Sequence, residues 1–189
     1  MNNSLDKFNR LVDALSELPT IGKKSATRLA YFMIINDNYI GMKLSHAIED
    51  AIGSLRKCNI CGGMSEDELC FICTDEKRDD TVLCIVENAK DILLLEENAL
   101  FDGKYFVLNN LDELTISKLL NIAYNGISEI IFALTPSVAN DAVILYIEDK
   151  LNDTEINFSK IAQGVPTGVS LENIDLLSLT RALEDRVRV

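Results

Sequence analysis

Residues 81–87 read TVLCIVE, a continuous run of apolar side chains that lies between Thr81 and Glu87. Strands of parallel sheets are buried on both faces, so they appear in a sequence as unbroken apolar runs rather than as alternating patterns. The run therefore predicts a central strand of a parallel sheet. Cys84 lies inside it, and because a free buried cysteine behaves as a small hydrophobic residue, we interpret Cys84 as part of the core.

The chain after this run alternates between helical and strand-like patterns. Helices are expected at 89–100, 113–126 and 137–151, and strands are expected at 105–109, 129–135 and 155–162. Strands that alternate with helices across short connections are typical of a parallel α/β sheet with helices on its faces. The tail has a Gly/Pro turn at 164–168 and a further helical pattern from about Ile174.

The chain before residue 58 has a different, helical pattern. Apolar residues spaced three and four apart predict amphipathic helices over 5–18, from about Lys24 onward, and over 41–55. Pro19 is expected to end the first helix, because the residue before a proline disfavours helical geometry. The apolar residues that show this spacing are Phe8, Leu11, Val12, Leu15, Leu18, Ala26, Leu29, Ala30, Met33, Ile34, Leu44, Ile48, Ile52 and Leu55.

Four of the five cysteines form two Cys-x-x-Cys pairs, Cys58 with Cys61 and Cys70 with Cys73. Each pair can place two thiolates on one side of a turn, and four sulfur ligands with no open position describe a structural zinc site. So short a segment cannot fold on its own core, so zinc would hold it together, and we expect zinc removal to unfold 58–73 before the sheet. Two redox pairs, or plain buried cysteines, are the alternative interpretations.

The stretch LPTIGKKSATRLA, residues 18–30, joins the first two predicted helices. Gly22 lets the backbone approach a ligand closely, and the free amides at the start of the following helix attract phosphate. Lys23, Lys24 and Arg28 add positive charge, with Lys24 and Arg28 four residues apart on one face. Nothing here reads bases, so DNA binding would be independent of sequence. An ordinary helix-turn-helix corner with surface lysines is the alternative.

The net charge of -12 argues against a surface that binds nucleic acid everywhere. The cations gather in the first third of the chain, however, which is what a modular chain with one DNA-facing end would show. No apolar run is long enough to cross a bilayer and the N-terminus does not resemble a signal peptide, so a cytoplasmic location is expected.

Glu87 ends the first predicted strand, on the side where open α/β sheets bind ligands. A Mg²⁺ site there would need carboxylates from neighbouring strands. The loop after the strand at 129–135 offers one, Asp141, and no Asp-x-Asp pair. Glu87 and Asp141 are thus weak magnesium candidates, and a structural or partner-binding role is the alternative.

The order of these segments resembles the bacterial RecR family of recombination mediators over nearly the full length. The resemblance is carried by LPTIGKKSATRLA (18–30), CNICGGMSEDELCFICTDEKRD (58–79), LCIVENAKDILLLE (83–96), GKYFVL (103–108), TPSVANDAVILYI (135–147) and IAQGVPTGVSLENIDLLSLTRALEDR (161–186). A lone hairpin motif would be weak, but the four-part order is specific.

The resemblance implies four parts: a helix-hairpin-helix DNA-binding region at 1–55, a four-cysteine zinc finger at 56–77, an α/β Toprim domain at 78–163 and a C-terminal arm at 164–189. It implies zinc on the four cysteines, DNA contacts at Lys24 and Arg28, and the Toprim acidic position at Glu87. It also implies no catalytic activity, assembly into homodimer or tetramer rings around DNA, and action with RecO and RecF to load recombinase onto single-stranded DNA.

The chain departs from the family pattern in three places. Thr20 replaces the first glycine of the hairpin and Lys23 replaces its proline, the acidic segment after the third strand is reduced to Asp141, and the insert between Leu108 and Ile116 is short. The leading hypothesis is a non-catalytic DNA-binding recombination mediator. The alternatives are a Mg²⁺-dependent Toprim nuclease or primase-like enzyme, which the missing acidic pair disfavours, and a scaffold that never touches DNA.

Overall fold

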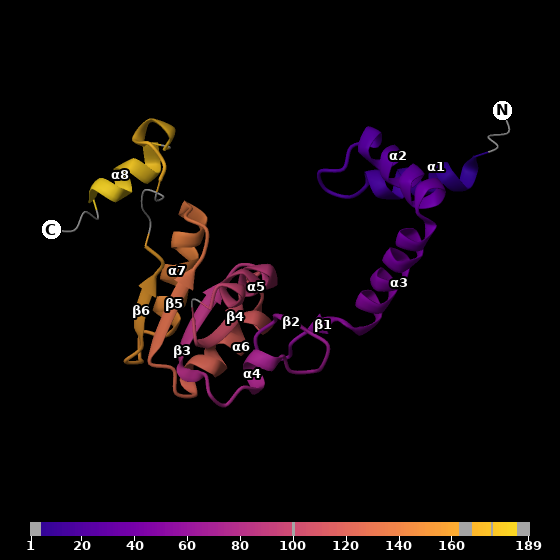
Figure 1. Ribbon diagram of the computed structural model, residues 1–189. Coiled ribbons are helices and arrows are strands. Elements are labelled where there is room, and N and C mark those ends of the chain that lie inside the picture. Colours follow the sequence, from indigo (N-terminus) through magenta and orange to yellow (C-terminus); the bar gives the residue numbers. More distant parts are fainter. Residues whose placement is uncertain (1–4, 100, 163–167, 175, 185–189) are drawn as a thin grey trace. The chain divides into compact units, whose positions relative to one another are not determined.

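A computed structural model describes residues 5–99, 101–162, 168–174 and 176–184. The chain divides into two compact units, the first ending at Leu55 and the second beginning at Arg56. Each unit is described by itself, and the elements are labelled as in Figure 1. No helix in the described ranges is long and apolar enough to cross a membrane.

The first unit is helical, as the apolar spacing predicts. Its elements are α1 (Asp6–Ser16), α2 (Lys23–Tyr31), the π-helical turn η1 (Phe32–Asn36) and α3 (Asn38–Ser54). Helix α1 ends before Pro19, as expected. Its core is small: Val12, Ala26 and Ala30 are buried, with Phe8, Leu11, Leu15 and Ile21 packed around them. The two alanines let α1 and α2 approach closely.

Helix α3 contributes no buried side chain to this core. The helix itself is confirmed, but its apolar stripe lies on the surface, with Leu44, Ile48, Ile52 and Leu55 between 44% and 78% exposed. The spacing identified an apolar face of this helix but did not say what covers it. None of the four belongs to the α1–α2 core, so α3 has an uncovered apolar face within the described residues of this unit.

The second unit contains the predicted parallel sheet. Its strands are β3 (Asp79–Val86), β4 (Gly103–Val107), β5 (Glu129–Ala133) and β6 (Asn157–Lys160), in the order β4-β3-β5-β6 with every pairing parallel. The helices between them are α5 (Ala89–Glu97), α6 (Glu113–Tyr124) and α7 (Val138–Lys150), and they lie against the sheet (Figure 1). This is the α/β order read from the sequence.

Strand β3 is buried on both faces, as its continuous apolar run predicts. Leu83 and Ile85 face the larger core, and Cys84 and Val86 face the other. The larger core also includes Phe106, Ile116, Leu119, Ile130, Phe132, Ile147 and Leu151. The second core contains Ile92, Tyr105 and Val107, and it also contains Ile72 and three of the paired cysteines. The cysteine segment is thus built into the sheet's core.

The cysteine segment covers the outer edge of β4, the edge strand of the sheet. It contains β1 (Arg56–Lys57), β2 (Met64–Ser65) and α4 (Phe71–Thr74). The backbone amide of Val107 donates to the carbonyl oxygen of Cys61 at 2.8 Å. The Lys104 ammonium group donates to the carbonyl oxygens of Ile72 (3.0 Å) and Asp75 (2.8 Å). The Val107 contact pairs one backbone amide of an edge that could otherwise pair with another chain, and the Lys104 contacts hold the cysteine segment against the strand.

The C-terminal region is described in part. A short 3-10 turn, η2 (Leu171–Asn173), precedes α8 (Leu176–Glu184), which agrees with the helix expected from about Ile174. Residues 164–167 of the predicted Gly/Pro turn, and residues 175 and 185–189 of the predicted arm, lie outside the described residues.

Candidate functional site

The four paired cysteines come together in the second unit. Their sulfur atoms all lie within 4.8 Å of one another. The Sγ atoms of Cys58 and Cys73 are 3.8 Å apart, and those of Cys61 and Cys70 are 3.6 Å apart. A tetrahedral zinc ion with Zn–S bonds of about 2.3 Å requires sulfurs about 3.8 Å apart. The donor set and spacing therefore fit one structural zinc ion, and the residue assignment made from sequence stands.

The backbone around the cysteines is shaped to hold thiolates. Gly62 has a φ of 74°, in the left-handed region that a side chain disfavours, and this turn follows the first Cys-x-x-Cys pair. The amide of Gly63 donates to the Cys61 sulfur, and the amide of Cys70 donates to the Cys58 sulfur, each at 3.3 Å. These amides stabilise charged sulfurs, which are the form that binds zinc.

Without a bound metal, the clustered thiols differ in how readily they lose a proton. A hydrogen bond from Cys73 lowers the pKa of Cys61 to about 5, while burial raises the pKa of Cys70 to about 11. The hydrogen bond to Cys61 raises the pKa of Cys73. Zinc has to displace the remaining protons, so its binding releases protons to solvent and weakens as the pH falls.

The turn between α1 and α2 lies in the first unit and has an open helix start. Gly22 is the N-cap of α2, and no side chain caps that end. A Cβ atom added at Gly22 would meet nothing within 4 Å, and its φ of -78° suits any residue. The fold therefore does not itself require glycine here. Lys23, Lys24 and Arg28 are all exposed.

Thr20 adopts a glycine-like conformation in the same turn. Its φ is 70°, one of two positive values among the described non-glycine residues. A β-branched residue in this region is strained. The turn therefore keeps its shape although threonine replaces the glycine of the family pattern. The expected effect of Thr20 is a lower stability of the first unit.

Glu87 follows β3 and is held by residues that follow β5. Its carboxylate accepts from the Thr135 amide at 3.0 Å, from the Thr135 hydroxyl at 2.9 Å, and from the Asn140 side-chain amide. These hydrogen bonds, that of the Thr135 hydroxyl above all, lower the pKa of Glu87. Three of about four lone-pair positions of the carboxylate are occupied. Thr135 and Asn140 were not among the residues singled out from the sequence, because neither carries a carboxylate and their contact with Glu87 depends on the pairing of β3 with β5.

Neither Asp141, the other acidic candidate, nor Asp91, which lies four residues after Glu87, joins Glu87 in a cluster of possible metal ligands. Asp141 lies in the first turn of α7 and approaches Lys160 at 4.0 Å. Asp91 accepts from the Asn88 amide in the capping box of α5. Across the described residues, the one group of three or more possible metal ligands is the cysteine cluster.

The arrangement defines a class of protein: a helix-hairpin-helix unit and a four-cysteine zinc finger, followed by a Toprim-like parallel α/β domain. Two family models match the chain. One is described as RecR, helix-hairpin-helix, and matches residues 8–52. The other is described as the zinc finger domain of RecR with four cysteine ligands, and matches residues 55–75.

Similar curated proteins cover the whole chain. It is 53% identical over 190 residues to Recombination protein RecR of a Nitratiruptor species, with 100% of both proteins covered. It is 53% identical to the protein of the same name from Campylobacter jejuni subsp. doylei, again over 100% of both. It is 46% identical to that of Helicobacter pylori (strain Shi470), over 98% of this chain and 97% of the relative. The chain belongs to the RecR family.

Proposed function

We propose that this protein is a non-catalytic, DNA-binding mediator of recombinational DNA repair that acts in the cytoplasm. In this proposal, residues 1–55 contact DNA, 56–77 form the zinc finger, 78–163 form the Toprim domain and 164–189 form an arm. The protein acts with RecO and RecF to load recombinase onto single-stranded DNA. The support comes from family membership, from relatives named recombination protein, and above all from the open start of α2.

The DNA contact is assigned to the turn that contains Gly22, Lys23, Lys24 and Arg28. The uncapped amides at the start of α2 can bind a phosphate oxygen, because a helix N-terminus has unpaired donors and a positive dipole end. The ion pairs formed among the described residues are Arg78–Glu96 and Lys160–Asp141, and neither draws on these three cations. Their charge is therefore available to a polyanion.

Assembly of several copies is part of the proposal. The exposed stripe of α3 borders an apolar hollow of about 450 Å³, lined by residues that include Leu15, Met33 and Ile48. Such a face is costly to leave in water, and a second copy of the same unit is the occupant proposed. A single acidic chain is expected to bind DNA weakly. Several hairpins on one duplex would strengthen binding, because the first contact raises the effective concentration of the other hairpins near the DNA.

The enzyme alternative has less support. A Toprim-type magnesium site needs carboxylates with free lone pairs, and Glu87 is tied to Thr135 and Asn140. Asp141 is turned to Lys160 at a salt-bridge distance. Mg²⁺-dependent cleavage of DNA or synthesis of a primer by the pure protein would overturn the non-catalytic interpretation.

A charge-reversal experiment tests the DNA contact. Lys24→Glu with Arg28→Glu should weaken binding to a fluorescent duplex at least tenfold at low salt, and should make the log–log salt dependence less steep. Lys7→Glu with Lys43→Glu makes the same change in net charge in the same unit and is the matched control, because both side chains are exposed. Equal loss in both variants would mean that net charge, not the turn, controls binding.

A second experiment tests assembly. Ile48→Glu with Ile52→Glu places two charges on the proposed α3 interface and should lower the molar mass measured by light scattering. Leu94→Glu on α5, which is 60% exposed in the other unit, is the control. An unchanged molar mass in the α3 variant would remove this face from the proposed interface.

A further inference from the structure

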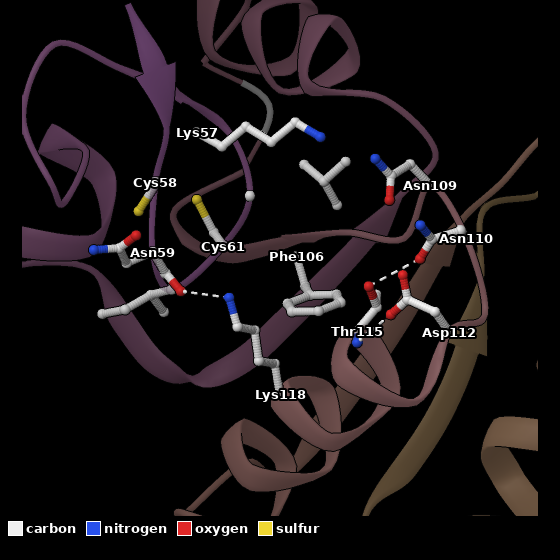
Figure 2. A pocket seen from close by; sticks show the side chains of 13 residues that line it. Lys57, Cys58, Asn59, Cys61, Phe106, Asn109, Asn110, Asp112, Thr115 and Lys118 are labelled. Carbon is white, nitrogen blue, oxygen red and sulfur yellow. Dashed lines mark hydrogen bonds between the residues drawn. The ribbon is translucent and has the colours of Figure 1, made fainter.

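A cavity at the junction of the zinc finger and the sheet has no role in the function proposed above. Its volume is about 250 Å³, and it lies beyond the carboxyl end of β4 (Figure 2). Lys57 and the first cysteine turn form one wall, and the start of α6 with Lys118 forms another. Asn109 and Asn110, which follow β4, complete the polar lining.

The cavity lies on the side of the sheet where α/β domains bind ligands. Strand order β4-β3-β5-β6 reverses direction between β3 and β5, which is the usual position for a ligand crevice. The Glu87 network with Thr135 and Asn140 occupies that position here. The hollow beyond β4 is the neighbouring space on the same side of the sheet.

The charge of the cavity is positive in a chain that is strongly acidic. Lys57 and Lys118 both line it, and neither takes part in an ion pair within the described ranges. Lys118 donates only a long hydrogen bond, 3.5 Å, to the Asn59 carbonyl oxygen. The one acid in the lining, Asp112, accepts from the Thr115 amide at 2.7 Å and caps α6. The positive charge of the two ammonium groups therefore exceeds the negative charge of Asp112, whose carboxylate already accepts a hydrogen bond.

The remaining walls suit the parts of a nucleotide that adjoin a phosphate. The Asn109 and Asn110 side chains are exposed and carry both donors and acceptors. Ile60, which is 41% exposed, adds an apolar side chain to the lining. The volume is below the range of about 300–1,000 Å³ that encloses a whole small molecule. It suits one phosphate with its sugar, while the rest of the ligand remains outside.

We propose that this cavity binds the phosphate group of a nucleotide between the ammonium groups of Lys57 and Lys118. Its ligand is either one unit of a single-stranded nucleic acid or a free mononucleotide. The site lies in the second unit and is distinct from the hairpin turn, so it stands whether or not Lys24 and Arg28 contact DNA. In the strand-binding case, the chain has two separate phosphate contacts on its two units.

The test uses the full-length, zinc-loaded protein carrying Lys24→Gln and Arg28→Gln, so that the hairpin contributes little. Lys57→Gln with Lys118→Gln should lower affinity for a fluorescent oligothymidylate at least tenfold. The slope of log affinity against log salt should become less negative by about 0.7, the single-strand value for one phosphate that is no longer neutralised. Lys77→Gln with Lys90→Gln, two exposed lysines of the same unit, is the matched control.

A parallel titration with thymidine monophosphate and with inorganic phosphate, by calorimetry, distinguishes the sources. Strand binding without mononucleotide binding assigns the cavity to nucleic acid, and mononucleotide binding lost in the Lys57/Lys118 variant assigns it to a free nucleotide. Asn109→Asp adds a carboxylate to the lining without changing a residue of the zinc finger, and it should weaken binding of the same ligand. Zinc content is measured in every variant. Equal affinities in the Lys57/Lys118, Asn109 and control variants for all three probes would overturn the proposal.

Discussion

The backbone amide of Val107 donates a 2.8 Å hydrogen bond to the carbonyl oxygen of Cys61, so the last residue of an edge strand is joined directly to a zinc ligand. The two residues also share one buried cluster, in which Cys61 is fully buried and Val107 is 7% exposed. The zinc finger and the sheet are therefore mechanically coupled, although they are separate segments of sequence.

Zinc removal should affect the sheet as well as the finger. Chelation is expected to speed hydrogen exchange first in residues 58–73, because the metal replaces a core there. The Val107 amide should lose protection in the same step, since its acceptor belongs to the finger. Hydrogen–deuterium exchange with mass spectrometry measures both. Full protection of the β4 peptide after complete zinc loss would contradict the coupling.

After zinc removal, thiol labelling should show four rapidly reacting cysteines and one slowly reacting cysteine, Cys84. The four clustered thiols become reactive when zinc is removed, because residues 58–73 are expected to unfold and to lose the burial that raises the pKa of Cys70. Cys84, by contrast, is 4% exposed in the sheet, and burial raises its pKa to about 12. At pH 8 a thiol with that pKa is ionised in about one molecule in 10,000, and the thiolate is the reactive form.

Iodoacetamide should therefore modify four cysteines rapidly after chelation. The fifth should react rapidly only in denaturant. A Cys84→Ala variant identifies the slow site, and rapid modification of five thiols in the folded apo protein would contradict the assignment.

The sequence predicted the sheet well because its signals are local. The unbroken run around Cys84 favoured a strand covered on both faces, and the spacing of the paired cysteines favoured a zinc site. The Glu87 partners were not predictable in the same way, because Thr135 and Asn140 meet Glu87 through the parallel pairing of β3 with β5. The exposure of the α3 stripe was not predictable for a related reason: helical spacing identifies an apolar face but not what covers it.

Replacing Thr20 with glycine should stabilise the first unit. The left-handed conformation costs a non-glycine residue about 1–2 kcal/mol, and glycine loses about 0.5–1 kcal/mol through its greater freedom in the unfolded chain. The net gain expected is about 0.5–1 kcal/mol, measured by urea unfolding. Thr20→Val retains the branched side chain at the same φ and should show no gain. Equal stability of the glycine and valine variants would mean that the turn stores no strain.

The Glu87 network should make stability depend on pH in the acid range. Its pKa is lowered from 4.5 in the folded protein, so the unfolded chain binds the proton more tightly. The contribution is complete above pH 4.5 and is lost as the pH falls through the lowered folded value. Because Glu87 is partly exposed, we expect no more than about 1 kcal/mol. In thermal unfolding, the Glu87→Gln variant should be less stable than wild type at pH 6, and the difference should shrink as the pH falls below 4.5. Glu97→Gln, an exposed acid on α5, should show no such difference, and the same pH profile in both variants would remove the network as its cause.

Gly22→Asp should move stability and DNA binding in opposite directions. Aspartate is among the best N-cap residues, and α2 starts at a glycine without a side-chain cap. The open space around Gly22 admits the new side chain, which should stabilise the first unit by a few tenths of a kcal/mol to about 1 kcal/mol. The same carboxylate would occupy the amides proposed to bind phosphate and would repel it. Duplex affinity at low salt should therefore fall at least tenfold.

Gly22→Ser separates the two effects, because serine caps the helix without adding charge. It should stabilise α2 similarly and weaken binding less than aspartate does. Fluorescence anisotropy with a labelled duplex and urea unfolding of the same preparations give the two readouts. If both variants fold with unchanged or raised stability and bind DNA as the wild type does, the start of α2 is not the phosphate contact. Glycine at position 22 would then have no explanation in either the fold or the proposed interface, since neither its φ of -78° nor its surroundings require it.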